Sequence, residues 1–345
     1  MNKTNCCPSY NGHPPIDGKI PVVSAALTLR DHIGALKARL GINRISYTVR
    51  PGLYAAGKPG KTSPVLVSAN YKLTFDTLRK NLDGVDCWLL ILDTKGINVW
   101  CAAGKGTFGT DELINRIESS ELAKYVSHKT LIIPQLGATG VSAHAVKKRA
   151  GYNVKYGPVR AEDVKPYIGA GYTATKDMRT VKFTMRDRAV LTPMELIPAM
   201  KVSLPVMGVM LLSNKIIKKP FDKTDFAVFA GAVLSGSVLT PVCLPYIPGK
   251  AFAFKGWLAG LGVTAAIQKL TGKNEKRNSL STAGHLLLFP ALSAYLAMNF
   301  TGSSTYTSPS GVNKEMKKSL PFIVGAAAIG GALMFGVHLF AGRKK

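Results

Sequence analysis

The stretch Cys87-Trp-Leu-Leu-Ile-Leu92, followed after a short turn by Asn98-Val-Trp-Cys-Ala-Ala-Gly-Lys-Gly-Thr107, decides the fold of the first half of the chain. A continuous apolar run of this length, bounded by turn residues, is typical of a β-strand that is buried on both faces. The segment that follows sets one cysteine among small residues and glycines, which let a large ligand approach the backbone. We therefore expect a ligand at the end of this strand.

Apolar runs of strand length alternate with segments of helical periodicity on both sides of this stretch. The predicted helices are 29–40, 71–82, 110–117, 141–149 and 161–168, and the predicted strands are 42–49, 65–67, 87–92, 131–133 and 152–156, with 97–100 as a further β-prone run. Residues 51–64 are rich in Gly, Pro and Lys and are predicted to be a loop. The alternation predicts an α/β fold with a mostly parallel, Rossmann-like sheet.

The second half of the chain is much more apolar. Five apolar segments, each near the ~20 residues that a membrane-spanning helix needs, lie at about 196–214, 225–246, 251–270, 281–300 and 319–341. The predicted parts are a flexible arm (1–22), a ligand-binding α/β domain (23–168), a basic connector (169–195) and an all-α transmembrane domain of about five helices (196–345). Small residues at four-residue spacing predict close helix packing at Ala227, Gly231 and Ser235, and at Gly256, Gly260 and Thr264.

The chain is strongly basic, with 45 Lys and Arg against 19 Asp and Glu and a formal net charge of +26. No RNA- or DNA-binding signature accompanies this charge, and basic loops beside spanning segments are ordinary in membrane proteins, so nucleic acid is not an expected partner. The apolar segments hold no paired carboxylates. This favours an anchor over an ion pump.

The membrane topology is open at this stage. If all five segments span, the basic loops lie on the side opposite the first domain, against the positive-inside tendency. If the first segment, with Lys201 and Pro205, lies along the interface, those loops share the side of the first domain and the tendency is obeyed. Four and five spans are both compatible with the sequence.

The start of the chain has no apolar core of the kind that a secretory signal needs, so the first domain is expected in the cytoplasm, at the inner membrane. The five cysteines, Cys6, Cys7, Cys87, Cys101 and Cys243, show neither metal-finger nor ferredoxin spacing. Cys87 and Cys243 are interpreted as packing residues, and the pair Cys6–Cys7 as incidental. No cluster of the protein's own is expected.

Cys101 is the candidate functional residue. A buried cysteine that packs as a small hydrophobic side chain is the alternative. A phosphate-binding loop is not supported, because Gly106 stands where Ser or Thr should follow Lys105, and Val99 stands where Gly is needed. A zinc site is not supported either, because no second Cys or His lies at ligand spacing. A lone thiolate suits a metal that a macrocycle already holds.

On these residues the chain resembles the HgcA family, the corrinoid proteins of microbial mercury methylation, whose cap-helix motif matches Asn98 to Lys105. The first half is also similar to the corrinoid domain of the large subunit of the corrinoid iron–sulfur protein, through Pro51-Gly-Leu-Tyr54, residues 65–74 and Gly157-Pro-Val-Arg-Ala161. The resemblance covers nearly the whole chain. It implies a Rossmann-like corrinoid-binding domain followed by a membrane domain usually drawn with five helices.

The resemblance implies that Cys101 is the lower axial ligand of cobalt in a cobalamin-type corrinoid. The implied corrinoid-binding residues are Asn70, Thr74, Asn98, Val99, Trp100, Cys101, Ala102, Ala103, Gly104, Lys105, Gly106, Thr107, Gln135, Leu136, Gly137, Ala138, Gly157, Pro158, Val159, Arg160 and Ala161. A histidine ligand such as His128 or His144 is a poor second, because the spacing of the Asp-x-His-x-x-Gly pattern is absent.

The implied activity is transfer of a methyl group from Cys-ligated methylcobalt to Hg(II), which gives methylmercury. Hg(II) is an electrophile, so the methyl group leaves as a carbanion equivalent or a radical, and a donating thiolate stabilises the oxidised cobalt. The implied partners are a ferredoxin-type 4Fe–4S electron donor like HgcB, a methyltetrahydrofolate-linked methyl donor protein, Hg(II) and the lipid bilayer. The basic first half would favour an acidic electron carrier.

Two other functions are compatible with the same residues. One is a membrane-anchored corrinoid methyl carrier for another acceptor, such as a thiol or an acetyl-CoA synthase-like partner. The other is a corrinoid-binding transport protein. Cys101 discriminates among the three, because an uptake protein needs no axial thiolate and a generic methyl carrier usually lacks a protein ligand on the lower face.

Overall fold

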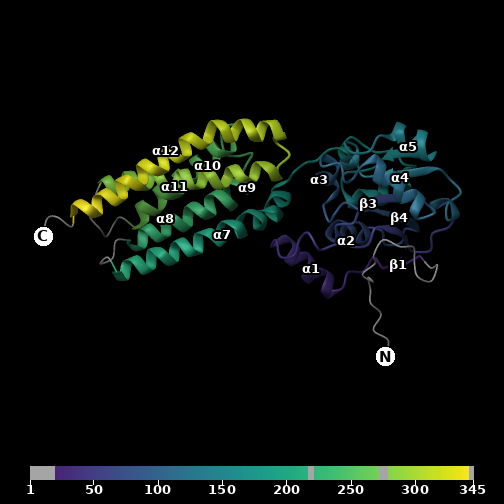
Figure 1. Cartoon of the computed structure of the whole chain (residues 1–345), viewed down its shortest axis with the longest axis horizontal. Helices are drawn as coiled ribbons and strands as arrows, with labels where there is room; N and C mark the ends of the chain where they lie inside the picture. Colours follow the sequence, from purple (N-terminus) through teal and green to yellow (C-terminus); the bar gives the residue numbers. More distant parts are fainter. Residues whose placement is uncertain (1–19, 217–220, 272–278, 342–345) are drawn as a thin grey trace, which may run out of the picture. The chain divides into compact units, whose positions relative to one another are not determined.

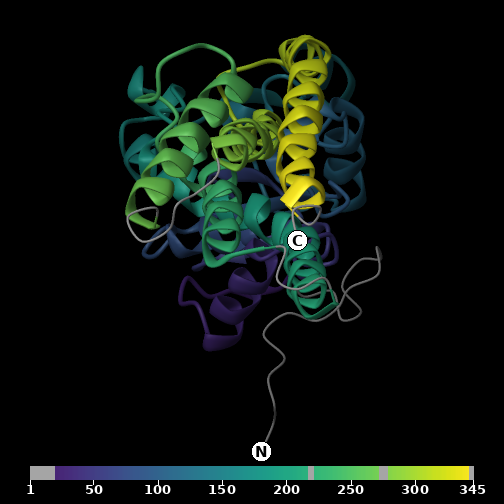
Figure 2. The ribbon, with the colours of Figure 1, turned by 90° about the vertical axis from the view of Figure 1, so that its left-hand side faces the viewer.

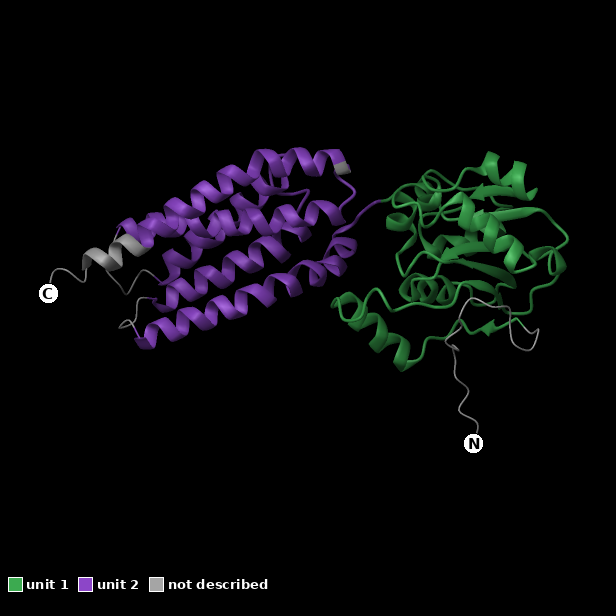
Figure 3. Ribbon diagram, in the orientation of Figure 1, with its two compact units in different colours: residues 1–181 green, residues 182–345 purple. Residues whose placement is uncertain are grey.

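The computed structural model describes residues 20–216, 221–271 and 279–341. The chain forms two compact units, residues 1–181 and 182–345 (Figure 3). The boundary between them falls within the predicted basic connector. Most of the predicted arm, including Cys6 and Cys7, lies outside the described residues.

Unit 1 is built on a six-stranded sheet with the strand order β1-β2-β4-β3-β5-β6 (Figure 1). The strands are β1 (Val22–Val23), β2 (Gly52–Ala56), β3 (Val65–Ala69), β4 (Cys87–Leu92), β5 (Thr130–Ile133) and β6 (Asn153–Tyr156). Strands β4, β3, β5 and β6 run parallel, β2 is antiparallel to β4, and β1 is parallel to β2. The predicted α/β fold is confirmed, with a mixed sheet whose larger part is parallel.

Helices cover both faces of this sheet. They are α1 (Leu29–Arg39), α2 (Lys72–Lys80), α3 (Val99–Gly104), α4 (Thr110–Ser119), α5 (Ala143–Ala150) and α6 (Val164–Gly169), with short 3₁₀ turns η1 (Leu122–Lys124), η2 (Gln135–Gly137), η3 (Ala161–Asp163) and η4 (Asp177–Arg179). Alternate residues of β4 enter two separate cores. Leu90 and Leu92 pack with residues of α3, α4 and α5, whereas Leu89 and Ile91 pack with residues of α2 and α6.

Cys87 opens β4 and is fully buried in the core on the α2 side. Burial, with a smaller contribution from the charge of Asp86, raises the pKa of its thiol to about 12. The interpretation of Cys87 as a packing residue is therefore confirmed.

Three predicted elements of unit 1 are wrong. Residues 42–49, predicted as a strand, form turns that begin at Gly41, whose φ is 77°, and end in an isolated bridge between Thr48 and Tyr71. The segment 51–64, predicted as a loop, contains β2, because pairing with β4 outweighs its Gly and Pro residues. The β-prone run 97–100 instead leads into α3, since the Asn98 side chain caps that helix.

The secondary structure of unit 2 is helical throughout its described residues, and Figure 2 shows these helices obliquely from one end. Its elements are α7 (Met185–Ile216), α8 (Lys223–Leu234), the π-helical turn η5 (Ser235–Leu239), α9 (Thr240–Val242), α10 (Phe252–Thr271), α11 (Ser279–Asn299), the 3₁₀ turn η7 (Phe300–Ser303) and α12 (Pro309–Ala341). All five predicted apolar segments fall largely within these helices. Among the described residues, three helical segments are long and apolar enough to cross a membrane, namely Met185–Ile216, Lys223–Val242 and Ser279–Ser303.

Three is fewer than the five spans predicted. Helix α10 carries Lys255 and Lys269 within its 20 residues, which lowers its mean hydropathy. The side chains of α12 are described only as far as Met334, so they cover the predicted span 319–341 in part. Lys255 has local partners, because its Nζ donates to the carbonyl oxygens of Leu244 and Ile247, each at 2.6 Å.

The predicted small-residue faces do pack closely. A Cβ atom added to Gly231 would lie 2.7 Å from a methyl group of Ile267 on α10, and one added to Gly256 would lie 2.8 Å from the carbonyl oxygen of Ser293 on α11. Sequence reasoning missed a buried polar pair between α8 and α11, in which His285 Nε2 lies 2.6 Å from Asp225 Oδ1. This pair links the two helices inside the unit.

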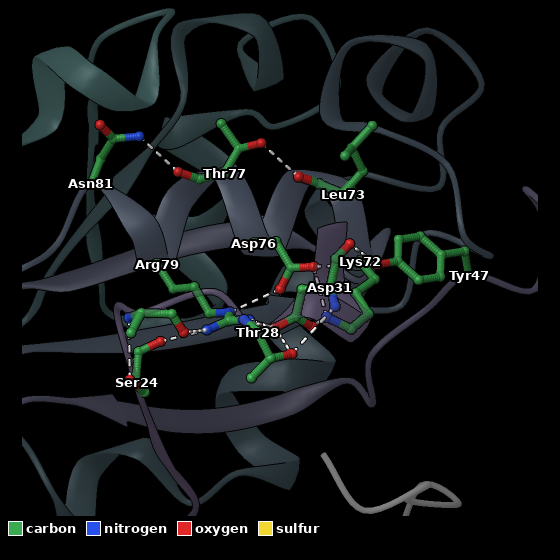
Figure 4. A network of polar contacts seen from close by, with 11 residues as sticks. Ser24, Thr28, Asp31, Tyr47, Lys72, Leu73, Asp76, Thr77, Arg79 and Asn81 are labelled. Carbon is green, nitrogen blue, oxygen red and sulfur yellow. Dashed lines mark hydrogen bonds and ion pairs between the residues drawn. The ribbon is translucent and has the colours of Figure 1, made fainter. Parts of the chain in front are cut away.

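Four charged side chains join α1 to α2 in unit 1 (Figure 4). Asp31 contacts Lys72 at 2.6 Å and Arg79 at 2.8 Å, and Asp76 contacts the same two cations at 2.6 and 2.8 Å. Burial alone would raise the pKa of Asp31, but hydrogen bonds from Lys72 and Thr28 outweigh burial and hold that pKa well below its usual range. The spacing of these residues along the chain did not predict this network.

Replacing Asp31 by Asn should lower the free energy of unfolding at pH 7 by about 3 kcal/mol, because Lys72 and Arg79 lose a shared buried anion. Since the pKa of Asp31 is depressed in the folded state, its contribution is complete above the unfolded value of about 3.9 and is lost as the pH falls below it. The difference between the wild type and Asp31→Asn should therefore vanish in acid. Urea unfolding followed by tryptophan fluorescence measures it, with the exposed Asp83→Asn as the matched control.

Candidate functional site

The carboxyl ends of β3, β4, β5 and β6 meet at one edge of the sheet. The chain leaves β3 for β4 through α2 on one side, and leaves β5 for β6 through α5 on the other, so β3 and β5 flank a topological switch point. The loops diverge at such a point and leave room for a ligand. Each predicted group of site residues lies in or directly after one of the four loops that begin at this edge. His128 precedes β5 and so lies at the opposite edge.

Cys101 lies on α3, which we call the cap helix, and its side chain is exposed. The cap helix begins after Asn98, whose Oδ1 accepts a hydrogen bond of 2.9 Å from the backbone N–H of Cys101. Val99, Ala102 and Ala103 bury one face of the helix in the core of the sheet. Because the buried face is occupied by these residues, the thiol is held on the outer face, and the interpretation of Cys101 as a core residue is wrong.

The exposed face of the cap helix is open. Trp100 is 39% exposed, and Gly104, Lys105 and Gly106 are exposed as well. A Cβ atom added to Gly104 would meet no heavy atom within 4 Å. A broad ligand can therefore lie against the thiol without first displacing side chains at Gly104.

The turn η2 packs against the buried side of the cap helix. Gly137 lets η2 approach Phe108, which follows the cap helix, because a Cβ atom at Gly137 would lie 2.5 Å from the ring of Phe108. Gly140, just after η2, lets the chain approach the cap helix itself, since its Cβ would overlap the carbonyl oxygen of Phe108 and lie 3.0 Å from Cα of Ala103. Sequence reasoning named Gly137 as a ligand contact and missed Gly140, although the run Gly137-Ala-Thr-Gly140 was a visible signal for close backbone packing.

Asn70 follows β3 and holds the loop that leads from β4 to the cap helix. Its Oδ1 accepts hydrogen bonds from the backbone N–H of Thr94 at 3.1 Å, from Thr94 Oγ1 at 2.9 Å and from the backbone N–H of Gly96 at 3.1 Å. Its Nδ2 donates to Asp93 at 3.2 Å. Asn70 is buried, so it acts on the site through this loop.

The remaining predicted residues belong to the loops after β5 and β6 and to α2. Gln135 accepts a hydrogen bond of 3.3 Å from Arg179, and its backbone N–H donates to the carbonyl oxygen of Pro158. Gly157 and Pro158 are buried, while Leu136, Ala138, Val159, Arg160, Ala161 and Thr74 are half-buried. The structure therefore brings the loops after β5 and β6 together, and it places η2 against the cap helix.

These features define an α/β domain with a mixed sheet, which carries an exposed cysteine on a cap helix at the carboxyl ends of its parallel strands. Residues 41–168 match the family model described as CO dehydrogenase/acetyl-CoA synthase delta subunit. The chain is 32% identical over 122 residues to the acetyl-CoA decarbonylase/synthase complex subunit gamma of Methanopyrus kandleri, which is 35% of this chain and 26% of that protein. It is 40% identical over 99 residues to subunit gamma 2 of that complex from Methanosarcina thermophila, which is 28% of this chain and 21% of that protein.

The chain thus spans about a quarter of the length of these relatives. The family match lies within unit 1 and includes the cap helix and all of the loops at the carboxyl edge. It supports the predicted similarity of the first half to the large subunit of the corrinoid iron–sulfur protein. The narrower resemblance to the HgcA family rests on the cap-helix sequence and stays a proposal.

Replacing Asn98 by Ala should loosen the cap helix, because the N-cap hydrogen bond to Cys101 is lost at a cost of about 1 kcal/mol. The backbone amides of residues 99–104 should then exchange with deuterium about fivefold faster, as that free energy implies. Asn98→Asp keeps the accepting oxygen and should restore slow exchange. Unchanged exchange in the Ala variant would show that the cap does not hold this helix.

Replacing Asn70 by Ala should free the loop between β4 and the cap helix, because the buried N–H groups of Thr94 and Gly96 lose their acceptor, at about 1–3 kcal/mol. Hydrogen exchange at residues 93–98 should rise, and the Cys101 thiol should react faster with a bulky maleimide. Asn81→Ala is the matched control, since the Asn81 side chain bonds within α2. An equal response in both variants would contradict the role given to Asn70.

Proposed function

We propose that the chain is a membrane-anchored, corrinoid-dependent methyltransferase in which Cys101 is the lower axial ligand of the corrinoid cobalt. The observation that carries the proposal is the exposed thiol on the N-capped cap helix, at the ligand-binding edge of a domain that matches acetyl-CoA synthase subunits. A buried cysteine at this place would have argued against it.

The donor set of the site suits a metal held in a macrocycle. Within the described ranges no three His, Cys, Asp or Glu side chains gather to hold a metal ion, whereas Cys101 offers one soft sulfur donor on an open surface. A macrocycle fills the equatorial positions itself and leaves an axial one for the protein. The residues proposed to hold the corrinoid are those of the cap helix with its flanking residues, Asn98 to Thr107, together with the loops at 135–138 and 157–161.

Bound corrinoid would supply a cobalt centre that takes up and gives away a methyl group. The contribution of this chain is to fix the donor atom and its surroundings. Asn98 sets the backbone of Cys101, and Asn70 sets the loop before it. Gly137 and Gly140 let the segment that contains η2 pack closely on Ala103 of the cap helix and on Phe108 beyond it. Such supporting contacts commonly change metal affinity or activity 10- to 100-fold, roughly, when they are removed.

We propose Hg(II) as the methyl acceptor and methylmercury as the product. The support is the cap-helix sequence, which resembles the HgcA family, together with an exposed cysteine sulfur as a soft donor suited to transfer toward an electrophile. The proposed partners are a ferredoxin-type 4Fe–4S electron donor, because the five cysteines of the chain lack cluster spacing, and a methyltetrahydrofolate-linked methyl donor protein. We place unit 2 in the inner membrane as a multi-pass anchor, with unit 1 in the cytoplasm.

A methyl carrier for an acetyl-CoA synthase-like partner is the second candidate. The names of the relatives favour it, since they are subunits of acetyl-CoA decarbonylase/synthase complexes. The two candidates differ in the acceptor and in the need for Cys101. A carrier of this kind would retain methyl transfer to its partner without the axial thiolate.

Replacing Cys101 by Ala should lower methylmercury formation at least about 100-fold in membranes that contain the protein, the electron donor and the methyl donor, because the metal loses its protein ligand. Cys243→Ala, on the half-exposed cysteine of unit 2, is the matched control and should keep wild-type activity. Full activity of Cys101→Ala would overturn the mechanism. Methyl transfer to a thiol or to an acetyl-CoA synthase, with none to Hg(II), would favour the second candidate.

A further inference from the structure

Helix α1 turns its apolar side chains away from unit 1. Leu29, Ile33 and Leu36 are 75%, 45% and 58% exposed. Their spacing places them in one stripe along the helix, and the half-buried Leu40 continues it. Ile42 and Ile45, in the turns that follow, are 50% and 78% exposed. An amphipathic helix packed on a domain normally buries such a stripe.

The opposite face of α1 is held against unit 1 by specific contacts. Asp31 forms ion pairs with Lys72 and Arg79 of α2 (Figure 4), and Ala38 is fully buried. A Cβ atom added to Gly34 would lie 2.5 Å from the hydroxyl of Tyr47. At 3.6 residues per turn these positions lie roughly opposite the apolar stripe. If the helix turned to bury its apolar stripe, it would break two ion pairs whose side chains are largely shielded from water.

Basic side chains flank the stripe. Arg30 and Lys37 lie on one side of it and Arg39 on the other, and all three are exposed. The acidic residue of the helix, Asp31, is occupied by its two cations on the inner face. An apolar stripe bordered by Lys and Arg is typical of a helix that lies in the interface of a bilayer with anionic lipids.

A bilayer is within reach of unit 1. Unit 1 ends at Val181, and the candidate membrane helix α7 begins at Met185. The linking residues 182–184 extend the chain by at most about 14 Å between those two ends. Once α7 is inserted, unit 1 is therefore kept close to the headgroups of the same membrane.

We propose that the apolar stripe of α1 docks on the surface of the bilayer that holds unit 2, with Arg30, Lys37 and Arg39 at anionic headgroups. The buried ion pairs of Asp31 fix the direction in which α1 faces, so this contact sets how unit 1 is turned relative to the membrane. The inference rests on the placement of unit 2 in a membrane. It does not depend on the corrinoid or on Cys101.

A photoreactive benzoylphenylalanine at position 36 tests the proposal in the full-length protein. The protein is inserted into vesicles of phosphatidylcholine and phosphatidylglycerol, which are isolated by flotation and washed with alkali before irradiation. The expected result is a phospholipid adduct at position 36, and none at the control position 148, an exposed residue of α5. A peptide adduct, from the same chain or from a second copy, would overturn the proposal, as would the absence of any adduct.

The headgroup contact is tested by the charge-reversed variant Arg30→Glu/Lys37→Glu in the same vesicles. The yield of phospholipid adduct at position 36 should fall several-fold in this variant, and also for the wild-type sequence in phosphatidylcholine alone. Equal yields under all conditions would overturn the assignment of the three basic residues to anionic lipid. Neither readout uses corrinoid content or methyl transfer, so its failure is distinguishable from failure of the proposed function.

Discussion

The parallel pairing of β3 with β4 is the constraint on which the site depends. Its register places Ala69 opposite Leu92, so the two strands end side by side. Asn70 then meets the first residues after β4 and binds Thr94 and Gly96. That loop leads to Asn98, whose side chain caps the N-terminus of the cap helix and accepts a hydrogen bond from the backbone N–H of Cys101. The pairing of two apolar strands thus determines where the Cys101 thiol lies, because Asn70 holds the loop after β4 and Asn98 caps the helix that carries the thiol.

The sequence predicted the parts of this arrangement that are encoded locally. The strand 87–92 was predictable because a strand buried on both faces has no polar alternation. The cap helix was harder, since Val99 and Trp100 favour a strand, and the Asn98 cap outweighs them. The exchange of strand and loop between 42–49 and 51–64 could not be predicted locally, because β2 gains its stability by pairing with β4, more than 30 residues away.

The residues of the candidate site follow the same division. Cys101 was identifiable from its neighbours, because small residues and glycines surround it in the sequence. The role of Asn70 could not be identified from its neighbours in the sequence, since its partners lie 24 and 26 residues further along the chain. The orientation of α1 was hidden for the same reason. Its Asp31 pairs with cations 41 and 48 residues away, and these pairs decide which face of the helix looks outward.

Several buried charged groups in the two units have close polar partners. Asp31 and Asp76 share two cations in unit 1, and in unit 2 the guanidinium of Arg188 donates to the carbonyl oxygens of Phe183 and Val242. A buried charge without such partners would be costly in a water-soluble domain and in a membrane-embedded one alike. The thiol of Cys101, by contrast, is exposed, which its proposed role as a metal ligand requires.

X-ray absorption at the cobalt edge tests the central claim most directly. The full-length protein is loaded with a cobalamin-type corrinoid, purified and compared with the Cys101→Ala variant prepared in the same way. We predict a cobalt–sulfur shell in the wild-type protein and its loss in the variant, with corrinoid bound in both. A spectrum without a sulfur shell in the wild type, or one unchanged by the substitution, would contradict the assignment of Cys101 as the axial ligand.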